Sequence, residues 1–144
     1  MIEDTRAHKI VWQYGSPSSN RLLSGAAFAS RLPNGNTLIT DSNHGRVIEI
    51  NASKKVVWSY STARRHGSMS MPLPTRAVRL KDGNTLISDQ FNDQVIEVTH
   101  AKHPTIVFAQ GSLGVVGKGL NKCNAPYDAK VVGDYTGLTK PSGF

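Results

Sequence analysis

The chain has 144 residues, of which 38% are hydrophobic and 19% charged, a composition that excludes an intrinsically disordered chain and suits one folded domain. Its apolar runs are shorter than the roughly 18 residues of a membrane-spanning helix, and its single cysteine excludes an internal disulfide or a cysteine-based zinc site. The formal net charge of +7 favours an anionic partner or simply keeps the chain in solution.

The first residues, MIEDTRAHKIVW, lack the apolar stretch of a signal peptide, so we expect a cytoplasmic protein if the chain is complete. Lys9 to Tyr14, KIVWQY, is rich in β-branched and aromatic residues and predicts a strand. Nearly the same pattern returns at Lys55 to Tyr60 as KVVWSY. We therefore interpret residues 9–14 as the last strand of a repeated unit.

The stretch from Leu32 to Ile50, LPNGNTLITDSNHGRVIEI, returns 48 residues later from Leu80 to Val98 as LKDGNTLISDQFNDQVIEV, with ten identities in nineteen positions. A period of this length indicates a repeat architecture. Asn and Gly residues that favour tight turns divide each unit into short runs rich in β-branched residues, which predict strands.

Four antiparallel strands in each unit are typical of one blade of a β-propeller. They are expected at residues 27–32, 37–40, 46–50 and 55–60 and again at 75–80, 85–89, 94–98 and 105–109. Pro126 to Leu138 resembles Pro74 to Leu86 and predicts a further blade. The expected fold of residues 1–144 is an all-β partial β-propeller, a single segment of about three blade-equivalents. Its parts are the last strand of a preceding blade (9–14), blade 1 (27–60), blade 2 (75–109) and the start of blade 3 (127–144).

GNTLITDSNHGRVIEI followed by KKVVWSY resembles the repeats of NHL-type and PQQ-like propellers and is most similar to those of the arylsulfotransferase-like propeller family. The resemblance implies a ring of six or more blades that binds ligands at its central channel. In the sulfotransferases, it further implies a channel histidine that accepts the sulfuryl group with the help of other His, Asn and Arg residues.

The long loops between blades are expected on one face of the propeller, where function usually lies. They are residues 15–26, 61–74 and 111–126, and they carry five basic residues, Arg21, Arg64, Arg65, Lys118 and Lys122, with no Asp or Glu. We therefore expect any ligand to be an anion bound on this face, near the ring axis.

Arg64-Arg65-His66 is the sharpest local signal on this face. Two guanidinium groups can bind a sulfate, phosphate or carboxylate, and the imidazole can act as acid, base or nucleophile, so His66 is the candidate catalytic residue. The alternative is an ordinary solvated loop. His44 lies in a turn on the same face, and its repeat equivalent is Asn92.

Arg76 and Asp128 are repeat equivalents at the start of the innermost strand, where Phe28 stands in the first unit. They either line the ligand site or form an ion pair between blades. The spacing of the histidines and carboxylates predicts no metal site, and no motif points to a cofactor.

The favoured function is a binding or interaction module that presents a basic loop face to an anionic small molecule or protein. The alternative is an arylsulfotransferase-like enzyme, or a fragment of one, that uses His66 or His44. The sequence does not favour nucleic acid, because it has no long basic run, and it predicts no membrane partner. Fewer than three blades do not close a ring of the usual four to eight, so we expect self-association that closes it, or a part of a longer propeller.

Overall fold

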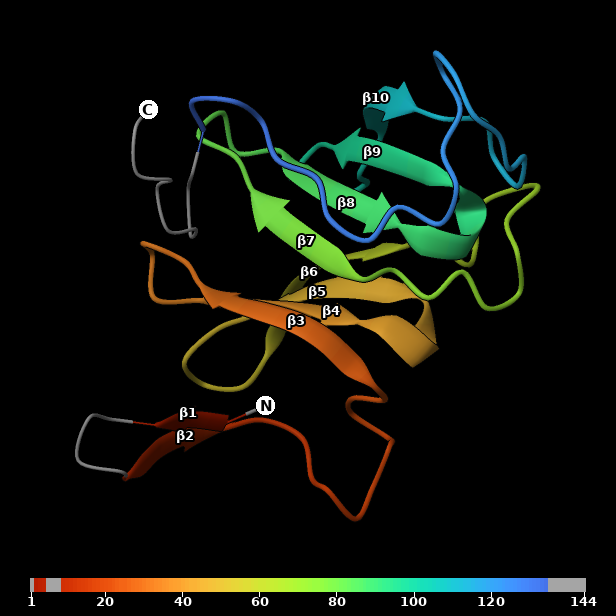
Figure 1. Cartoon of the computed structure of the whole chain (residues 1–144). Coiled ribbons are helices and arrows are strands. Elements are labelled where there is room, and N and C mark those ends of the chain that lie inside the picture. Colours follow the sequence, from red (N-terminus) through yellow and green to blue (C-terminus); the bar gives the residue numbers. More distant parts are fainter. Residues whose placement is uncertain (1, 5–8, 135–144) are drawn as a thin grey trace.

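The computed structural model describes residues 2–4 and 9–134, which form β-strands joined by turns and loops. The strands make two four-stranded antiparallel sheets and an N-terminal two-stranded hairpin (Figure 1). The two larger sheets lie where the two sequence repeats predict them. We refer to them as blade 1 and blade 2.

Blade 1 has the strand order β3-β4-β5-β6. Its strands are β3 (Ala26–Arg31), β4 (Thr37–Asp41), β5 (Arg46–Ile50) and β6 (Val56–Ser61). The turn between β3 and β4 closes where the Leu32 amide donates to the Asn36 carbonyl over 2.8 Å. Gly35 in this turn has a φ of 83°, a left-handed conformation that glycine adopts without a steric penalty.

Blade 2 repeats this order with β7 (Arg76–Arg79), β8 (Thr85–Asp89), β9 (Gln94–Val98) and β10 (Ile106–Gln110). In both blades a short 3-10 turn joins the second strand to the third: η1 (Ser42–His44) in blade 1 and η2 (Gln90–Asn92) in blade 2. Each ends in a left-handed residue, Gly45 or Asp93, with φ values of 58° and 53°.

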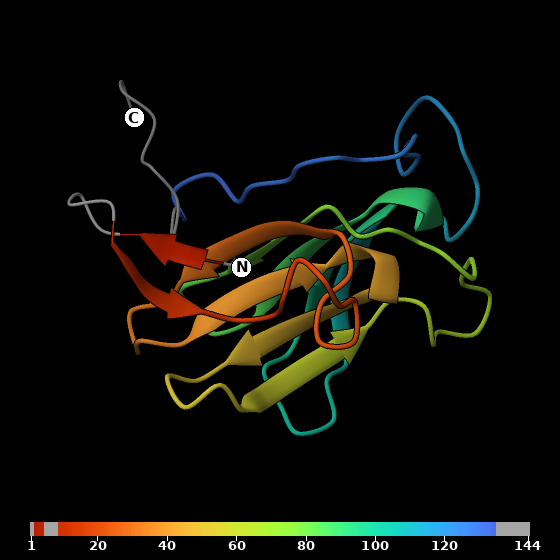
Figure 2. The ribbon, with the colours of Figure 1, turned by 90° about the horizontal axis from the view of Figure 1, so that it is seen from below.

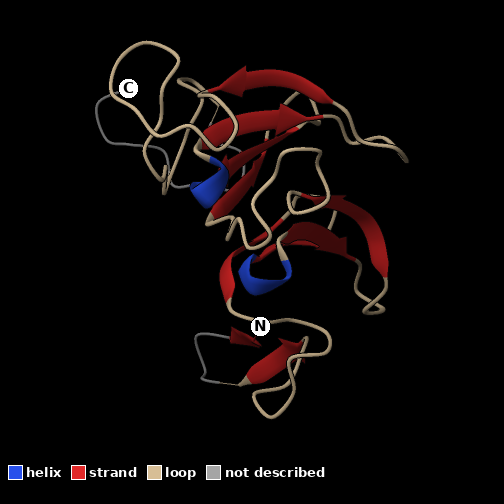
Figure 3. Ribbon diagram, turned by 90° about the vertical axis from the view of Figure 1, so that its right-hand side faces the viewer, coloured by secondary structure: helices blue, strands red, loops and turns tan. Residues whose placement is uncertain are grey.

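The long inter-blade loops, residues 15–25, 62–75 and 111–126, emerge on the same side of the molecule as η1 and η2. This side is on the right in Figure 1 and faces the viewer in Figure 3, whereas the β3–β4 and β5–β6 turns lie on the left of Figure 1. In Figure 2 the loop of residues 62–75 lies on the right. We call the three loops together with η1 and η2 the long-loop face.

The N-terminal hairpin pairs β1 (Ile2–Asp4) with β2 (Ile10–Gln13). The sequence analysis predicts β2 but misses β1. In register, Glu3 lies opposite Trp12, as Glu49 lies opposite Trp58 in blade 1. The hairpin therefore corresponds to the third and fourth strands of a preceding blade, and the Ile-Glu shared by residues 2–3 and 48–49 is the signal that reveals it.

The predicted third blade, 127–144, falls partly outside the described residues. The part that is described, up to Asp134, runs beside β7 without regular strand pairing. The Thr75 hydroxyl donates to the Tyr127 carbonyl over 2.6 Å, and the Lys81 amide donates to the Asp134 carboxylate over 2.7 Å. Self-association that would complete this blade stays a prediction.

Two apolar clusters hold blade 1 between its neighbours. One cluster packs against the N-terminal hairpin and contains Tyr14, Leu23, Ile39, Ile48 and Ile50, with Trp12 and Ala29 partly buried beside it. The other joins blade 1 to blade 2 and contains Leu32, Leu38, Val47, Trp58, Tyr60, Ala77, Ile87, Ile96 and Val98. Because side chains alternate across a strand, Val47 and Ile48 of β5 serve opposite clusters.

Blade contacts also include a buried ion pair between Glu49 of β5 and Arg79 of β7 at 2.8 Å. Burial opposes ionisation of Glu49, but hydrogen bonds from Asn36 and Asn34 and the guanidinium of Arg79 outweigh it and hold the pKa of this carboxyl below its ordinary value. His100, from the turn between β9 and β10, approaches the same carboxylate at 2.9 Å. Glu49 therefore links the two blades on the side opposite the long-loop face.

Truncation of a core residue tests this packing. Ile48 is fully buried, so Ile48→Ala should lower the free energy of unfolding by roughly 2–5 kcal/mol through lost burial and a cavity. Val57, which is 51% exposed on β6, supplies the matched control: Val57→Ala should change it by less than about 0.5 kcal/mol. Urea unfolding measures both, and equal losses would contradict the assignment of the core.

Candidate functional site

The structure separates the two arginines that the sequence places together. Arg65 turns into blade 2, where its guanidinium donates to the fully buried carboxylate of Asp89 over 3.1 Å and to the side-chain oxygen of Gln94. Arg64 stays exposed on the loop between the blades. Arg65 therefore fastens the loop to blade 2, whereas Arg64 is available to a ligand.

Arg76 and Asp128 form an ion pair between blades, one of the two alternatives that the sequence leaves open. The Arg76 guanidinium lies 3.1 Å from the Asp128 carboxylate. It also lies over the ring of Phe28, 4.3 Å from the ring centroid, in a cation–π contact. Arg76 thus contacts both of its repeat equivalents, Phe28 and Asp128, and both charges are engaged.

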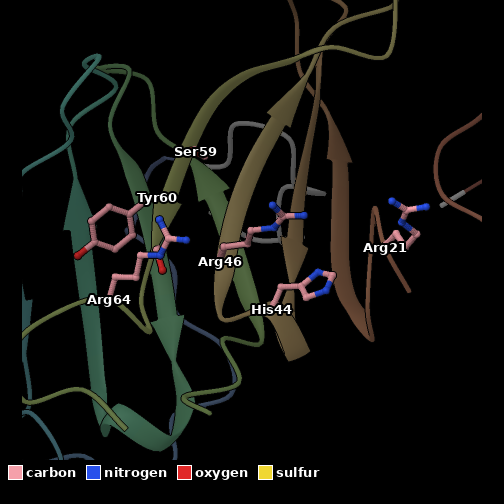
Figure 4. A pocket seen from close by; sticks show the side chains of 7 residues that line it. Arg21, His44, Arg46, Ser59, Tyr60 and Arg64 are labelled. Carbon is pink, nitrogen blue, oxygen red and sulfur yellow. The ribbon is translucent and has the colours of Figure 1, made fainter. Parts of the chain in front are cut away.

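A cavity of about 300 Å³ opens beside β6 on the long-loop face (Figure 4). It is lined by Arg21, His44, Arg46, Ser59, Tyr60, Ser61 and Arg64. His44 and Arg64 are sequence-predicted site residues, whereas His66 is exposed and does not line the cavity. The cavity lies along β6, the outermost strand of blade 1, and not beside the inner strands where the sequence analysis expects the ligand.

Arg46 is the site residue that the sequence analysis missed. It begins β5 directly after the turn, whereas the ligand-facing cations predicted from the sequence lie in the long loops and, as Arg76, at the start of an inner strand. The repeat comparison could have revealed Arg46. The equivalent residue of blade 2 is Gln94, so this position at the long-loop face carries a different residue type in each blade.

A buried carboxylate holds two of the cavity-lining side chains, His44 and Arg46, in place. Asp41, at the end of β4, is fully buried. Its Oδ2 accepts from Arg46 Nε over 2.7 Å and lies 2.7 Å from His44 Nδ1, and its Oδ1 accepts from the Ser24 amide over 2.7 Å. When Nδ1–H donates to this carboxylate, Nε2 of His44 is the ring nitrogen left for a ligand.

Arg46 also ties the first long loop to blade 1, because its terminal NH2 group donates to the Leu22 carbonyl over 2.8 Å. Figure 4 shows Arg46 and His44 at the centre of the site, with Arg21 to one side and Arg64 to the other. Within residues 2–4 and 9–134, neither Arg21 nor Arg64 makes an ion pair with a carboxylate. The lining therefore carries more positive charge than Asp41 neutralises.

Blade 2 has the same carboxylate in a different setting. Asn92 and Gln94 replace His44 and Arg46, and Arg65 supplies the cation. Burial raises the pKa of Asp89 to about 6, against the opposing effects of the Asn92 hydrogen bond and the Arg65 charge. Of the two blades, blade 1 therefore has the histidine and arginine beside the buried carboxylate, and blade 2 has two amides at these positions.

The pKa of Asp89 predicts a pH dependence of stability. Because the folded chain binds this proton more tightly than the unfolded chain, the free energy of unfolding should fall as pH rises from about 4 to about 6. Asp89→Asn should flatten this part of the profile, measured by urea unfolding at several pH values. Asp82→Asn, at an exposed turn, should leave the slope in place; an unchanged slope in Asp89→Asn would contradict the prediction.

No helix in the described part of the chain is long and apolar enough to cross a membrane. Among the same residues, no group of three or more His, Cys, Asp or Glu side chains is placed to hold a metal ion.

No protein-family model and no curated protein matches the chain. Among solved structures, it is similar to virginiamycin B lyase from Staphylococcus aureus, a β-propeller, with a TM-score of 0.50 and 17% identity over 71% of this chain. It is also similar to a protein of unknown function from Bacteroides caccae, with a TM-score of 0.48 and 21% identity over 75% of this chain. The matches span 31% and 38% of those chains. The fold is thus the predicted partial β-propeller of four-stranded antiparallel blades.

Proposed function

We propose that the chain is a β-propeller binding module whose blade 1 cavity takes an anionic group, carried by a small molecule or by a protein partner. The observation that supports this most strongly is the lining itself: three guanidinium groups and one imidazole meet at a single cavity. The carboxylate beside them, Asp41, is buried and already bonded to Arg46 and His44.

A sulfate, phosphate or carboxylate suits this lining. Guanidinium groups match the oxygens of these anions with parallel charge-assisted hydrogen bonds. Asp41 fixes Arg46 and His44 before a ligand arrives, which reduces the entropy lost on binding. A volume of about 300 Å³ is at the small end of ligand pockets, so the site would enclose an anionic group and leave the remainder of a larger ligand outside.

Loss of one ligand-facing cation tests the proposal. Arg64→Gln should weaken sulfate and phosphate binding by about tenfold to a hundredfold, because a charge-assisted hydrogen bond contributes about 1.5–3 kcal/mol. Titration calorimetry and the rise in Tm with added anion measure the effect. Lys55→Gln removes the same charge from a residue outside the cavity and should retain binding. Absence of any anion-dependent Tm shift in the wild-type protein would refute the site.

The second candidate is group transfer of the arylsulfotransferase-like kind, which the repeat resemblance suggests. One observation favours it: His44 lines the cationic cavity and is held by Asp41 through Nδ1. Nε2 would attack the sulfur of an aryl sulfate, forming an N–S bond as the S–O bond to the aryl group breaks and the phenolate leaves. An acceptor phenol would then attack that sulfur, break the N–S bond and release its proton to solvent.

This second candidate transfers the catalytic role from His66 to His44. If an aryl sulfate donor and a phenol acceptor give turnover, His44→Ala should reduce kcat by at least about a hundredfold, since it removes the nucleophile. His66→Ala, at an exposed histidine outside the cavity, should retain activity. Release of the donor phenol and formation of the sulfated acceptor report the rate. No turnover in the wild-type chain would reject the transfer activity and leave anion binding intact.

A further inference from the structure

The long-loop face exposes large apolar side chains on every long loop. Leu22 is 52% exposed on the first loop, and Met69 and Met71 are 51% and 58% exposed on the second. Leu120, on the third, is 96% exposed. Phe91 of η2 adds an aromatic ring that is 44% exposed. Scattered apolar residues are ordinary on a protein surface, but their presence on every long loop of one face indicates an interaction surface.

The exposed charges on this face are all positive among the described residues. The three long loops contain no Asp or Glu, and the three carboxylates at the base of the face, Asp41, Asp89 and Asp93, are buried. The exposed cations are Arg21, Arg64, Lys118 and Lys122. Each long loop therefore presents apolar groups next to unneutralised positive charge.

Hydrogen bonds to η2 and the residue after it hold both ends of the third loop, and an apolar residue lies between them. The Gly114 amide donates to the Asn92 carbonyl over 2.9 Å, and the Ala125 amide donates to the Asp93 carboxylate over 2.9 Å. Between these anchors, Lys118 and Lys122 flank Leu120 two residues away on either side. An apolar side chain at a loop tip, with lysines beside it, has the chemistry of a residue that enters the headgroup region of a bilayer while the lysines contact lipid phosphates.

We propose that the long-loop face docks on an anionic lipid membrane surface, with Leu22, Met71 and Leu120 entering the interface and the neighbouring cations contacting lipid headgroups. Figures 1 and 3 show the three loops on the same side of the blades, the side that would face the membrane. The sequence analysis expects no membrane partner because no segment can span a bilayer, but peripheral docking requires no such segment. The inference does not depend on a ligand in the blade 1 cavity.

Vesicle co-sedimentation tests the docking. The wild-type chain should bind vesicles of phosphatidylcholine with 30–40% phosphatidylglycerol and should bind pure phosphatidylcholine vesicles at least about tenfold more weakly, because each basic residue near an anionic surface adds to the attraction. Leu120→Ser combined with Met71→Ser should reduce partitioning to anionic vesicles by roughly tenfold or more, since two apolar side chains no longer leave water. Lys118→Gln combined with Lys122→Gln should reduce both binding and its salt dependence.

Val132→Ser is the matched control, because Val132 is 85% exposed but belongs to the segment beside β7 and not to the long-loop face; it should bind like the wild type. Circular dichroism establishes that every variant is folded. Equal binding to neutral and anionic vesicles would overturn the proposal. So would binding that survives the apolar substitutions, or light scattering that shows the apolar residues to be buried between two copies of the chain. Arg64→Gln separates the two proposals, because it should weaken sulfate binding at least about tenfold while vesicle binding falls only slightly.

Discussion

A buried carboxylate at the end of the second strand of each blade sets the organisation of the long-loop face. Asp41 and Asp89 are both fully buried, and a buried charge without partners costs several kcal/mol. The chain must therefore bring donors to each carboxylate. In blade 1 these donors come from the adjacent 3-10 turn, from the start of the third strand and from an inter-blade loop. In blade 2 they come from the 3-10 turn and an inter-blade loop, so in both blades the carboxylate fixes a turn and a loop.

The two blades meet this requirement with different residues, and the difference creates the site. In blade 2 the cation comes from Arg65, which crosses from the preceding loop and bonds to both Asp89 and Gln94. In blade 1 the donors His44 and Arg46 belong to the blade itself and also line the cavity. The same carboxylate thus fastens two blades in one repeat and orients a cationic cavity in the other.

The repeat made the blades predictable from the sequence, because turn residues and β-branched runs recur at a constant spacing and each strand then follows from local preference. The site was less predictable. Arg64 and Arg65 are neighbours in sequence, yet only the position of Asp89 decides that one turns inward. Arg46 escaped notice because its role depends on Asp41 and on the Leu22 carbonyl, contacts that arise only when strands pair and loops fold back.

On the side of the molecule opposite the long-loop face, an arginine of one blade lies over an aromatic ring of the preceding blade. Arg31 lies over Trp12 at 5.1 Å, and Arg79 lies over Trp58 at 5.4 Å. At the next boundary the aromatic residue is Phe108, and Val131 stands at the position that the arginine would occupy. Trp58 is 6% exposed, whereas Phe108 is 50% exposed. At the boundary of blades 1 and 2, Arg79 covers the ring of Trp58 and at the same time neutralises the buried Glu49. One arginine therefore shields an aromatic ring and a carboxylate of the preceding blade together.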